Sequence, residues 1–238
     1  MSASNKNALP LGEAAYRHIR DDIVACRLAP GERFTERGLA ESTGFGASPI
    51  REALTRLDHE GLIQTVPRKG YRVKPLTIKA VDDLFEFWLL IAPDMARQGV
   101  IRATDAQLAE IVATAEKALR LVNDPGTVRE RAAKGVALAD RIFNDLADAT
   151  GNVYFRTNLV QISAELARVW ALVIDSELLE GEIFAISPEL LPDISARNGD
   201  AMAKHVRAYI RDSHLRVLRT LARWPSVITS EVLPVGRP

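Results

Sequence analysis

Residues 46–73, GASPIREALTRLDHEGLIQTVPRKGYRV, decide the fold of the first part of the chain. Apolar residues recur in the first half of this stretch at i, i+3, i+4 and i+7, namely Ile50, Ala53, Leu54 and Leu57. This spacing predicts a helix over about 47–60 with one apolar face. The second half holds two β-prone runs, LIQTV and YRV, joined by PRKG, which is typical of a β-hairpin with Gly70 at its turn.

The sequence upstream of this stretch predicts two more helices. The first covers residues 12–27, where apolar side chains, Cys26 among them, fall three or four positions apart before the turn signal Pro30-Gly31. The second is short, from about Thr35 to Thr43, and Gly44 closes it. Three short helices followed by a two-stranded wing predict a winged helix-turn-helix domain, to which we assign residues 1–74.

The sequence beyond the linker KPLT is helical in pattern and has few β-branched runs. We predict helices near residues 78–99, 104–122, 127–149, 153–178, 188–197 and 200–223. The breaks between them fall at Asp124-Pro125-Gly126, at Thr150-Gly151-Asn152, around Gly181 and at Asn198-Gly199, and the tail after Trp224-Pro225 is expected to be extended. Helices of this length with short connections favour an antiparallel bundle. The fold class is therefore mainly α, with residues 75–238 forming an all-helical second domain.

Composition excludes several classes of protein. Among 238 residues, 47% are hydrophobic and 26% charged, as in ordinary globular proteins. The single cysteine rules out an intramolecular disulfide and a thiolate zinc cluster. No apolar run reaches the roughly 18 residues that cross a bilayer, and the first residues lack the apolar core of a secretion signal. We therefore expect a cytoplasmic protein with no membrane partner.

The net charge of zero conceals two unlike halves. Residues 1–74 carry twelve basic and nine acidic side chains, a charge of +3, and the remainder carries −3. Residues 61–74 hold four basic side chains and no acidic one. This modest asymmetry is consistent with a nucleic-acid partner for the first domain.

The outer face of the predicted 47–60 helix carries chemistry suited to DNA. Ser48 and the first backbone amides can bind phosphate, Pro49 fits the first helical turn, and Arg51 can reach guanine or phosphate. At the wing tip Arg68 and Lys69 would follow the DNA backbone or minor groove, and Gly70 would permit a close approach. The candidate DNA contacts from the residues alone are Ser48, Pro49, Arg51, Thr55, Arg68, Lys69 and Gly70. An ordinary solvated helix face is the alternative, and for Arg56 a salt bridge within the domain is as reasonable as a DNA contact.

The stretch AYRHIRDDIVACRLAPGERFTERGLAESTGFGASPIREALTRLDHEGLIQTVPRKGYRV resembles the DNA-binding domain of the GntR family of bacterial transcription regulators. The resemblance is strongest to the FadR-like subgroup, which has an all-helical effector domain called FCD. It implies operator contacts from a second-helix arginine, recognition-helix arginines and a wing glycine, which match Arg37, Arg51 and Gly70. The family often has serine or threonine where this chain has Gly46, and arginine where it has Ala47.

The later segments VDDLFEFWLLIAPDMARQGVIRATDAQLAEI and ADRIFNDLADATGN resemble the FCD domain. Many of its members bind a divalent metal through one aspartate and three histidines, with a carboxylate effector beside it. The aspartate matches Asp140, but the histidine positions fall on Asn144, near Glu189 or Leu190, and near Tyr209, and a common arginine appears as Trp88. We therefore expect no cofactor and a degraded metal site, with a divalent metal held through Asp140 as a minor alternative.

A pocket for an effector is predicted in the helical domain. Asp140 and Asn144 lie one turn apart on a helix whose apolar stripe includes Phe143, so they are expected to point inward, and a buried carboxylate needs a partner. The candidate pocket residues are Trp88, Asp140, Asn144, His205 and Tyr209. An organic acid is one candidate effector, while Trp88 and the missing histidines favour a larger or more apolar molecule. A buried hydrogen-bond network without any ligand is the alternative.

Together these features predict a regulator that binds a palindromic operator as a homodimer and responds to a small metabolite, most simply as a repressor. One alternative is a DNA-binding protein whose helical domain only dimerises it. A more remote one is an enzyme acting on a small acid, although the sequence has no HExxH motif, nucleophile elbow or phosphate-binding loop.

Overall fold

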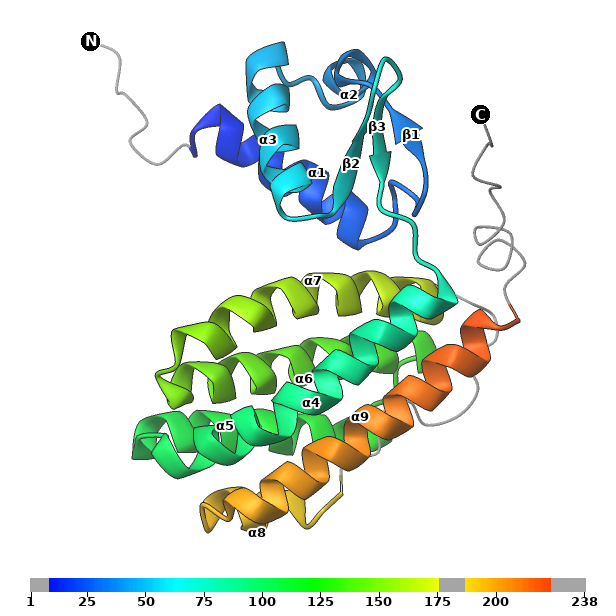
Figure 1. The fold of residues 1–238 in the computed structure, drawn as a ribbon. Helices are drawn as coiled ribbons and strands as arrows, with labels where there is room; N and C mark the ends of the chain where they lie inside the picture. The colour runs from blue at the N-terminus through cyan, green and yellow to red at the C-terminus, as the bar shows by residue number, and fades with distance from the viewer. Residues whose placement is uncertain (1–8, 176–186, 224–238) are drawn as a thin grey trace. The chain divides into compact units, whose positions relative to one another are not determined.

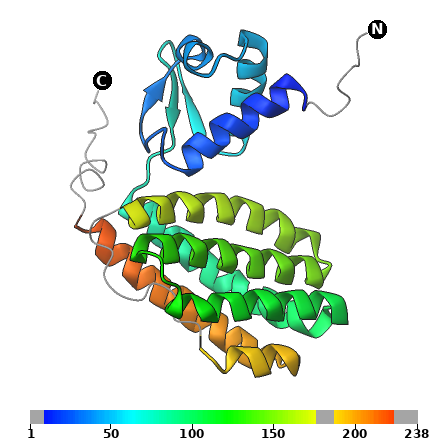
Figure 2. The ribbon, with the colours of Figure 1, turned by 180° about the vertical axis from the view of Figure 1, so that it is seen from behind.

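The computed structural model describes residues 9–175 and 187–223. The chain divides between Leu76 and Thr77 into two compact units, which we call unit 1 and unit 2 (Figures 1 and 2). The predicted break around Gly181 and the tail after Trp224 lie outside the described residues.

Unit 1 is a winged helix-turn-helix, as predicted. Its helices are α1 (Leu11–Val24), α2 (Glu36–Thr43) and α3 (Ala47–His59), and its strands are β1 (Arg33–Phe34), β2 (Ile63–Val66) and β3 (Gly70–Val73). The strands form an antiparallel sheet in the order β1-β3-β2, with Phe34 opposite Tyr71 and Val66 opposite Gly70. The prediction of a two-stranded wing missed β1, because two residues are too short to produce an alternating pattern.

The core of unit 1 is built from the apolar faces that the spacing predicts. The buried residues of its helices are Ala15, Tyr16, Ile19, Ile23, Leu39, Ile50, Ala53, Leu54 and Leu57. The first helix, however, ends at Val24 and not at residue 27. Cys26 has a left-handed backbone with φ of 55°, so it lies beyond the helical stripe on which it was expected and is only half-buried.

Unit 2 is all-helical in its described residues, which confirms the predicted class. Its long helices are α4 (Ile78–Arg102), α5 (Asp105–Arg120), α6 (Val128–Thr150), α7 (Val153–Asp175) and α9 (Gly199–Leu221), with a short 3₁₀ turn η1 (Leu121–Asn123) and a short helix α8 (Leu190–Ser195). Helix α4 packs against α6 and α9, and α6 packs against α5 and α7 (Figure 1). None of the helices in these described ranges is long and apolar enough to cross a membrane.

Local sequence signals fix where these helices begin and how closely they pack. Thr104 and Thr127 each start a helix with a capping box, in which the side chain three residues later, Gln107 or Glu130, bonds back to the cap. Gly99 lets α4 approach α6, because a Cβ at this position would lie 2.6 Å from the carbonyl oxygen of Leu146.

Candidate nucleic-acid interface and helical cavities

Two residues fix the ends of α2, and the second of them begins the turn into α3. The Thr35 hydroxyl accepts a hydrogen bond from the Gly38 amide at 3.1 Å and so caps the start of α2. Gly44 ends α2 in the left-handed conformation with φ of 75°, where glycine is favoured. Helix α3 then begins at Ala47, with Pro49 in its first turn, where a missing N–H costs nothing.

The outer face of α3 exposes Ser48, Arg51 and Thr55, three of the predicted DNA contacts. Arg51 is 68% exposed and its Nη2 lies 3.2 Å from the Glu36 carboxylate of α2. Tyr71 of β3 donates a hydrogen bond to the other oxygen of Glu36 at 3.1 Å. Glu36 therefore joins the recognition-like helix to the wing and holds Arg51 on the surface of the protein.

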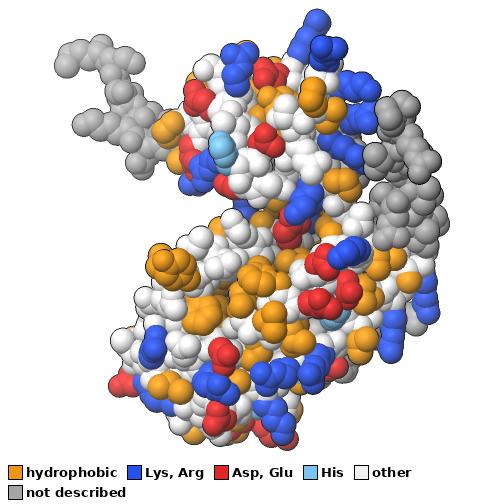
Figure 3. All heavy atoms as spheres, viewed as in Figure 1, with side chains coloured by type: hydrophobic (Ala, Val, Ile, Leu, Met, Phe, Trp, Pro, Cys, Tyr) orange, Lys and Arg blue, Asp and Glu red, His pale blue; other side chains and the backbone are white. Residues whose placement is uncertain are grey.

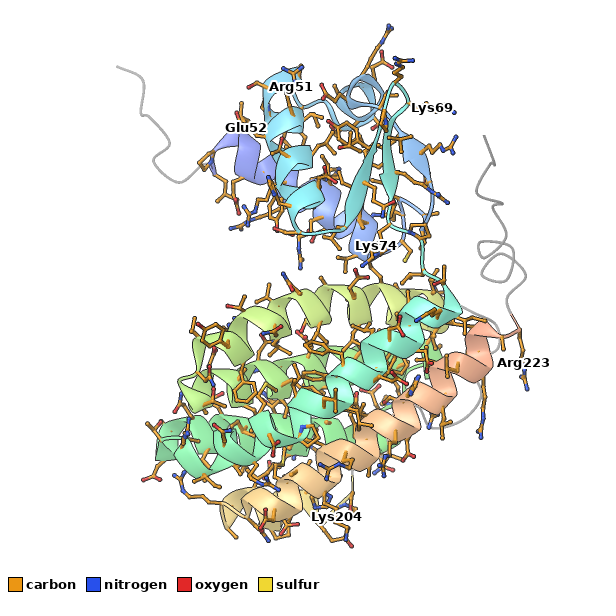
Figure 4. The ribbon with its side chains drawn as sticks, viewed as in Figure 1. Arg51, Glu52, Lys69, Lys74, Lys204 and Arg223 are labelled. Carbon is orange, nitrogen blue, oxygen red and sulfur yellow. The ribbon has the colours of Figure 1, made fainter. Side chains whose placement is uncertain are left out.

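The remaining basic candidates are also exposed. Arg37 of α2 is 89% exposed and pairs with Glu41 at 2.7 Å. Arg68 and Lys69 form the tip of the wing, where Arg68 has a positive φ of 62°. Figure 4 shows Arg51 and Lys69 at one end of unit 1 and Lys74 at the opposite end. Basic side chains of two separate elements are thus gathered on one side of this unit.

The fold itself favours glycine at position 70, for a reason that the sequence did not indicate. Its φ is 84°, and a Cβ at this position would lie 2.5 Å from the carbonyl oxygen of Phe34 in β1. A side chain at position 70 would therefore force the wing or β1 to shift. This requirement exists whether or not Gly70 approaches DNA.

Arg56, which the sequence left open, is engaged within unit 1. Its Nη1 lies 2.9 Å from Glu13 of α1, its Nε lies 3.2 Å from Glu60, and its guanidinium stacks over the Tyr16 ring. The Tyr16 hydroxyl donates to Glu60 at 2.8 Å, and burial followed by this carboxylate raises the pKa of Tyr16. This network fastens α3 to α1, so the salt-bridge alternative describes Arg56 in this structure.

Two acidic residues near the candidate contacts were missed by sequence reasoning. Glu36 lies 15 positions before Arg51, and nothing in the sequence pattern connects them. Glu52 accepts a hydrogen bond from the Ser48 hydroxyl at 3.3 Å, a pairing that the four-residue spacing on one helix could have revealed. The face offered by α3 is therefore mixed in charge.

Unit 2 contains two cavities near the predicted pocket. The smaller cavity, about 60 Å³, is lined from α4, α6, α7 and α9, and the larger, about 210 Å³, is lined from α6, α8, α9 and Ser187. Trp88, Asp140 and Tyr209 line the smaller one, and His205 and Tyr209 line the larger one. Asn144 is not among the described residues that line either cavity. Four of the five predicted pocket residues thus line one or both of two cavities, and Asn144 lines neither.

The interior of the smaller cavity is aromatic. Trp88 of α4 is buried and meets the Phe143 ring edge-on, with centroids 4.9 Å apart. The Phe143 and Tyr209 rings lie 5.9 Å apart. Burial raises the pKa of Tyr209 above its ordinary value, and a hydrogen bond with Ser213 acts in the opposite direction. The Tyr209 hydroxyl therefore stays protonated at any physiological pH.

The expectation that Asp140 points into the interior is wrong, because its side chain is exposed. The buried positions of α6 include Gly135, Ile142, Phe143 and Leu146, which place Asp140 on the border of the apolar stripe. The half-buried Asn144 amide donates to Asp140 at 3.1 Å, and its carbonyl accepts a hydrogen bond from Arg156 of α7. The carboxylate lies at the edge of the smaller cavity and not in a sealed core.

The residues at the family's metal position do not fit a metal ion. Asn144 uses its amide and its carbonyl in the bonds just described, and the Tyr209 hydroxyl keeps its proton. Within residues 9–175 and 187–223 no three His, Cys, Asp or Glu side chains are grouped around a point that could hold a metal. Without imidazole or thiolate, oxygen donors from one aspartate do not make a zinc or nickel site.

A winged helix-turn-helix with basic side chains at one end, joined to a helical unit with internal cavities, defines a transcription regulator of the DNA-binding class. Residues 11–73 match the family described as bacterial regulatory proteins, gntR family, and residues 83–212, more than half of the chain, match the FCD domain. The chain therefore belongs to the GntR family of bacterial transcription regulators, in the group that carries an FCD domain.

Relatives and solved structures agree with this assignment. The chain is 38% identical over 71 residues to the uncharacterized HTH-type transcriptional regulator YdhC of Bacillus subtilis, a match that spans 30% of this chain and only 32% of that relative. It is 24% identical over 200 residues to the HTH-type transcriptional repressor GlaR of Escherichia coli, covering 80% and 90% of the two chains. A GntR structure from Rhodococcus sp. RHA1 superposes with a TM-score of 0.65 at 17% identity, over 87% of this chain and 97% of that one, and shows the shared fold. These domains and relatives are those of transcription regulators and not of enzymes, so the alternative of an enzyme acting on a small acid is set aside.

Proposed function

We propose that this chain is a repressor that binds a palindromic operator as a homodimer and releases it when a small metabolite binds in unit 2. Residues 1–74 would be the DNA-binding domain, and residues 75–238 the domain for effector binding and dimerisation. The observation that carries the proposal is the gathering of Arg51 on α3 and Lys69 on the wing at one end of unit 1 (Figure 4). The name of the relative GlaR supports the choice of repressor over activator.

DNA recognition would use each candidate in a distinct way. Arg51 can form two hydrogen bonds to guanine once the DNA competes with Glu36, and Ser48 with the start of α3 would bind phosphate. Arg37, Arg68 and Lys69 would contact the backbone and give most of the salt-dependent affinity. Pro49 and Thr55 on α3 and Gly70 in the wing would determine how closely these two elements approach the DNA. Because operator DNA is in the bacterial cytoplasm, the protein would act there.

Dimer formation is supported by large apolar side chains exposed on unit 2. Phe87 and Leu90 of α4 are 43% and 75% exposed, and Tyr154 and Val160 of α7 are 76% and 49% exposed. Figure 3 shows hydrophobic side chains gathered over the face that α4 and α7 form. Exposed apolar patches of this kind mark interaction surfaces. A symmetric pair of winged domains would then read an inverted repeat.

The effector would bind among Trp88, Asp140, Tyr209 and His205, where the two cavities meet. A metal is not required in this proposal, since the donor set does not fit one. Binding would change operator affinity if the ligand prefers one arrangement of the two DNA-binding units over another. If unit 2 only dimerises the chain, no small molecule should stabilise it or alter its operator affinity.

The test is selection of bound duplexes from a random-sequence library by the purified chain, followed by footprinting. We expect the enriched sites to share an inverted repeat and the complex to contain two chains by light scattering. Arg51→Ala should abolish the enrichment, whereas Lys204→Ala on α9 should leave it unchanged. A site without two-fold symmetry, or no enrichment by the intact chain, would refute the proposed mode of binding.

A further inference from the structure

The two cavities share a wall, and its composition determines what the larger cavity can accept. Ala139, Phe143 and Tyr209 line both. On the larger side the remaining described lining is mostly aliphatic and comes from Ile142, Ala208, Leu190, Met202 and Val206. At about 210 Å³ this cavity exceeds the roughly 150 Å³ space that takes a benzene ring. The smaller cavity, at about 60 Å³, offers less than half of that space.

The larger cavity is elongated along one face of α9. Its α9 residues run from Met202 to Asp212, which corresponds to about 15 Å along the helix axis. Met202 and Val206 are buried, whereas Asp212 is exposed. The space therefore has an apolar body and an exposed carboxylate where the Asp212 turn of α9 lines it.

Within the described residues, the larger cavity is lined by one carboxylate, Asp212, and by one potential cation, His205. The charged or titratable side chains among the described residues that line it are Asp212, His205 and Tyr209. Tyr209 keeps its proton, and His205 lies 2.8 Å from the Asp193 carboxylate. Asp212 has no ion pair with any described residue. Asp140 adds a further carboxylate on the other side of Tyr209. No lysine or arginine is among the described residues that line either cavity.

An anionic ligand in the larger cavity would find only His205, among the described residues, to balance its charge, and His205 is already engaged by Asp193. Carboxylates are bound in proteins by arginine, lysine, protonated histidine, a metal or several directed N–H groups. Arg216 is the cation whose charge reaches the Tyr209 hydroxyl, but it does not line the larger cavity. A cation, in contrast, would be attracted by Asp212 and by the faces of Phe143 and Tyr209.

We propose that the larger cavity binds an amphiphilic organic cation, with its ammonium group at Asp212 and a ring or short alkyl chain packed between Met202, Phe143 and Tyr209. This inference rests on the proposed function only in taking the cavity as the effector site. It differs from the organic acid considered from the sequence, because the carboxylates at the cavity repel an acid. The specificity of the regulator is thus set by charge at one end and by apolar contact along the rest.

The experiment uses isothermal titration of the full chain with three probes of nearly equal shape: 2-phenylethylammonium, 2-phenylethanol and 3-phenylpropanoate. We expect saturable binding of the cation at least about tenfold tighter than of the acid, with the alcohol between them. Asp212→Asn should bring the cation to the affinity of the alcohol. The matched control is Asp200→Asn on the same helix, whose exposed carboxylate pairs with Arg97 away from the cavity and should change nothing.

A second variant locates the binding. Ala208 lines the larger cavity but is exposed, so the Ala208→Phe protein should fold normally. Its larger side chain should fill the space and weaken the binding of all three probes. Equal or tighter binding of 3-phenylpropanoate, cation affinity unchanged in Asp212→Asn, or no saturation with any probe would each overturn the proposal. The selection of operator DNA by the ligand-free chain is independent of these titrations. If the cation does not bind, the proposed DNA-binding function is unaffected. If no operator is selected, the titration result for the cavity is unaffected.

Discussion

The guanidinium carbon of Arg56 lies 3.5 Å from the centroid of the Tyr16 ring, so α3 is held on α1 by a cation against an aromatic face. The same side chain bridges Glu13 and Glu60. Arg56 is half-exposed, so each interaction is partly screened by solvent and their combined effect is modest.

Arg56→Ala should lower the free energy of unfolding of unit 1 by about 1 kcal/mol, because it removes the stacking on Tyr16 and two ion pairs. The three tryptophans of the chain, at positions 88, 170 and 224, all follow Leu76. Urea unfolding should therefore shift when followed by far-ultraviolet circular dichroism but not by tryptophan fluorescence. Arg17→Ala, which removes one exposed pair with Glu13, is the control and should shift neither signal measurably. Equal effects of the two variants would show that the Tyr16 stacking contributes nothing.

Gly70→Ala should destabilise unit 1 more than the same change at Gly61. Both glycines have positive φ, 84° and 70°, which costs an alanine about 1–2 kcal/mol at either site. Only at position 70 would the new Cβ also meet the Phe34 carbonyl oxygen, while nothing lies within 4 Å at position 61. The difference between the two variants in the urea midpoint by circular dichroism measures the steric part. If the two midpoints coincide, the wing yields to the added methyl group.

Arg51→Ala and Lys69→Ala should weaken operator binding in different ways. Loss of a two-bond contact with guanine costs about 1–3 kcal/mol and relaxes the sequence preference at that base pair. Loss of one phosphate contact at Lys69 weakens binding to all DNA sequences alike. It also lowers the slope of log affinity against log salt concentration by about 1. Fluorescence anisotropy on the selected site and on a single-base variant, at several salt concentrations, distinguishes these effects. If the Arg51→Ala protein still prefers the selected site to the single-base variant, then Arg51 contacts the DNA backbone and not a base.

Gly99→Ala should destabilise unit 2, because its Cβ would lie 2.6 Å from the Leu146 carbonyl oxygen and would push α4 away from α6. The loss should exceed the roughly 1 kcal/mol by which alanine ordinarily stabilises a helix over glycine. Tryptophan fluorescence reports this unit directly. Gly151→Ala is the comparison: it has open space around it, so it should lose only the about 1–2 kcal/mol that its positive φ of 66° costs an alanine. A stabilised Gly99→Ala protein would mean that the two helices can separate at no cost.

The helices of unit 1 and their buried faces could be predicted because each is a repeat of apolar residues along one element. The apolar set Ile50, Ala53, Leu54 and Leu57 is buried as its spacing indicates. Strand β1 could not be found this way, since its place in the sheet depends on pairing with Tyr71 and Arg72 far along the chain. The pairing of Glu36 with Arg51 is likewise a product of tertiary structure.

The candidate pocket was predicted less well, for a geometric reason. Residues at the border of an apolar stripe differ from interior ones by a fraction of a helical turn, and Asp140 falls on that border. Tyr209 and Trp88 line a cavity as their sequence positions suggested. The division of the space into two, with Asp212 at one end, follows from how α6 and α9 pack, which local periodicity does not encode.

In unit 2 the first helix, α4, packs directly against the last described helix, α9 (Figure 2). During synthesis, α4 therefore leaves the ribosome more than a hundred residues before its main partner exists. Unit 1 has no such delay, because its helices and wing are complete once Val73 has emerged. Each nascent chain thus holds a complete winged helix while unit 2 still lacks its last described helix, so we expect unit 2 to be the later of the two to become stable.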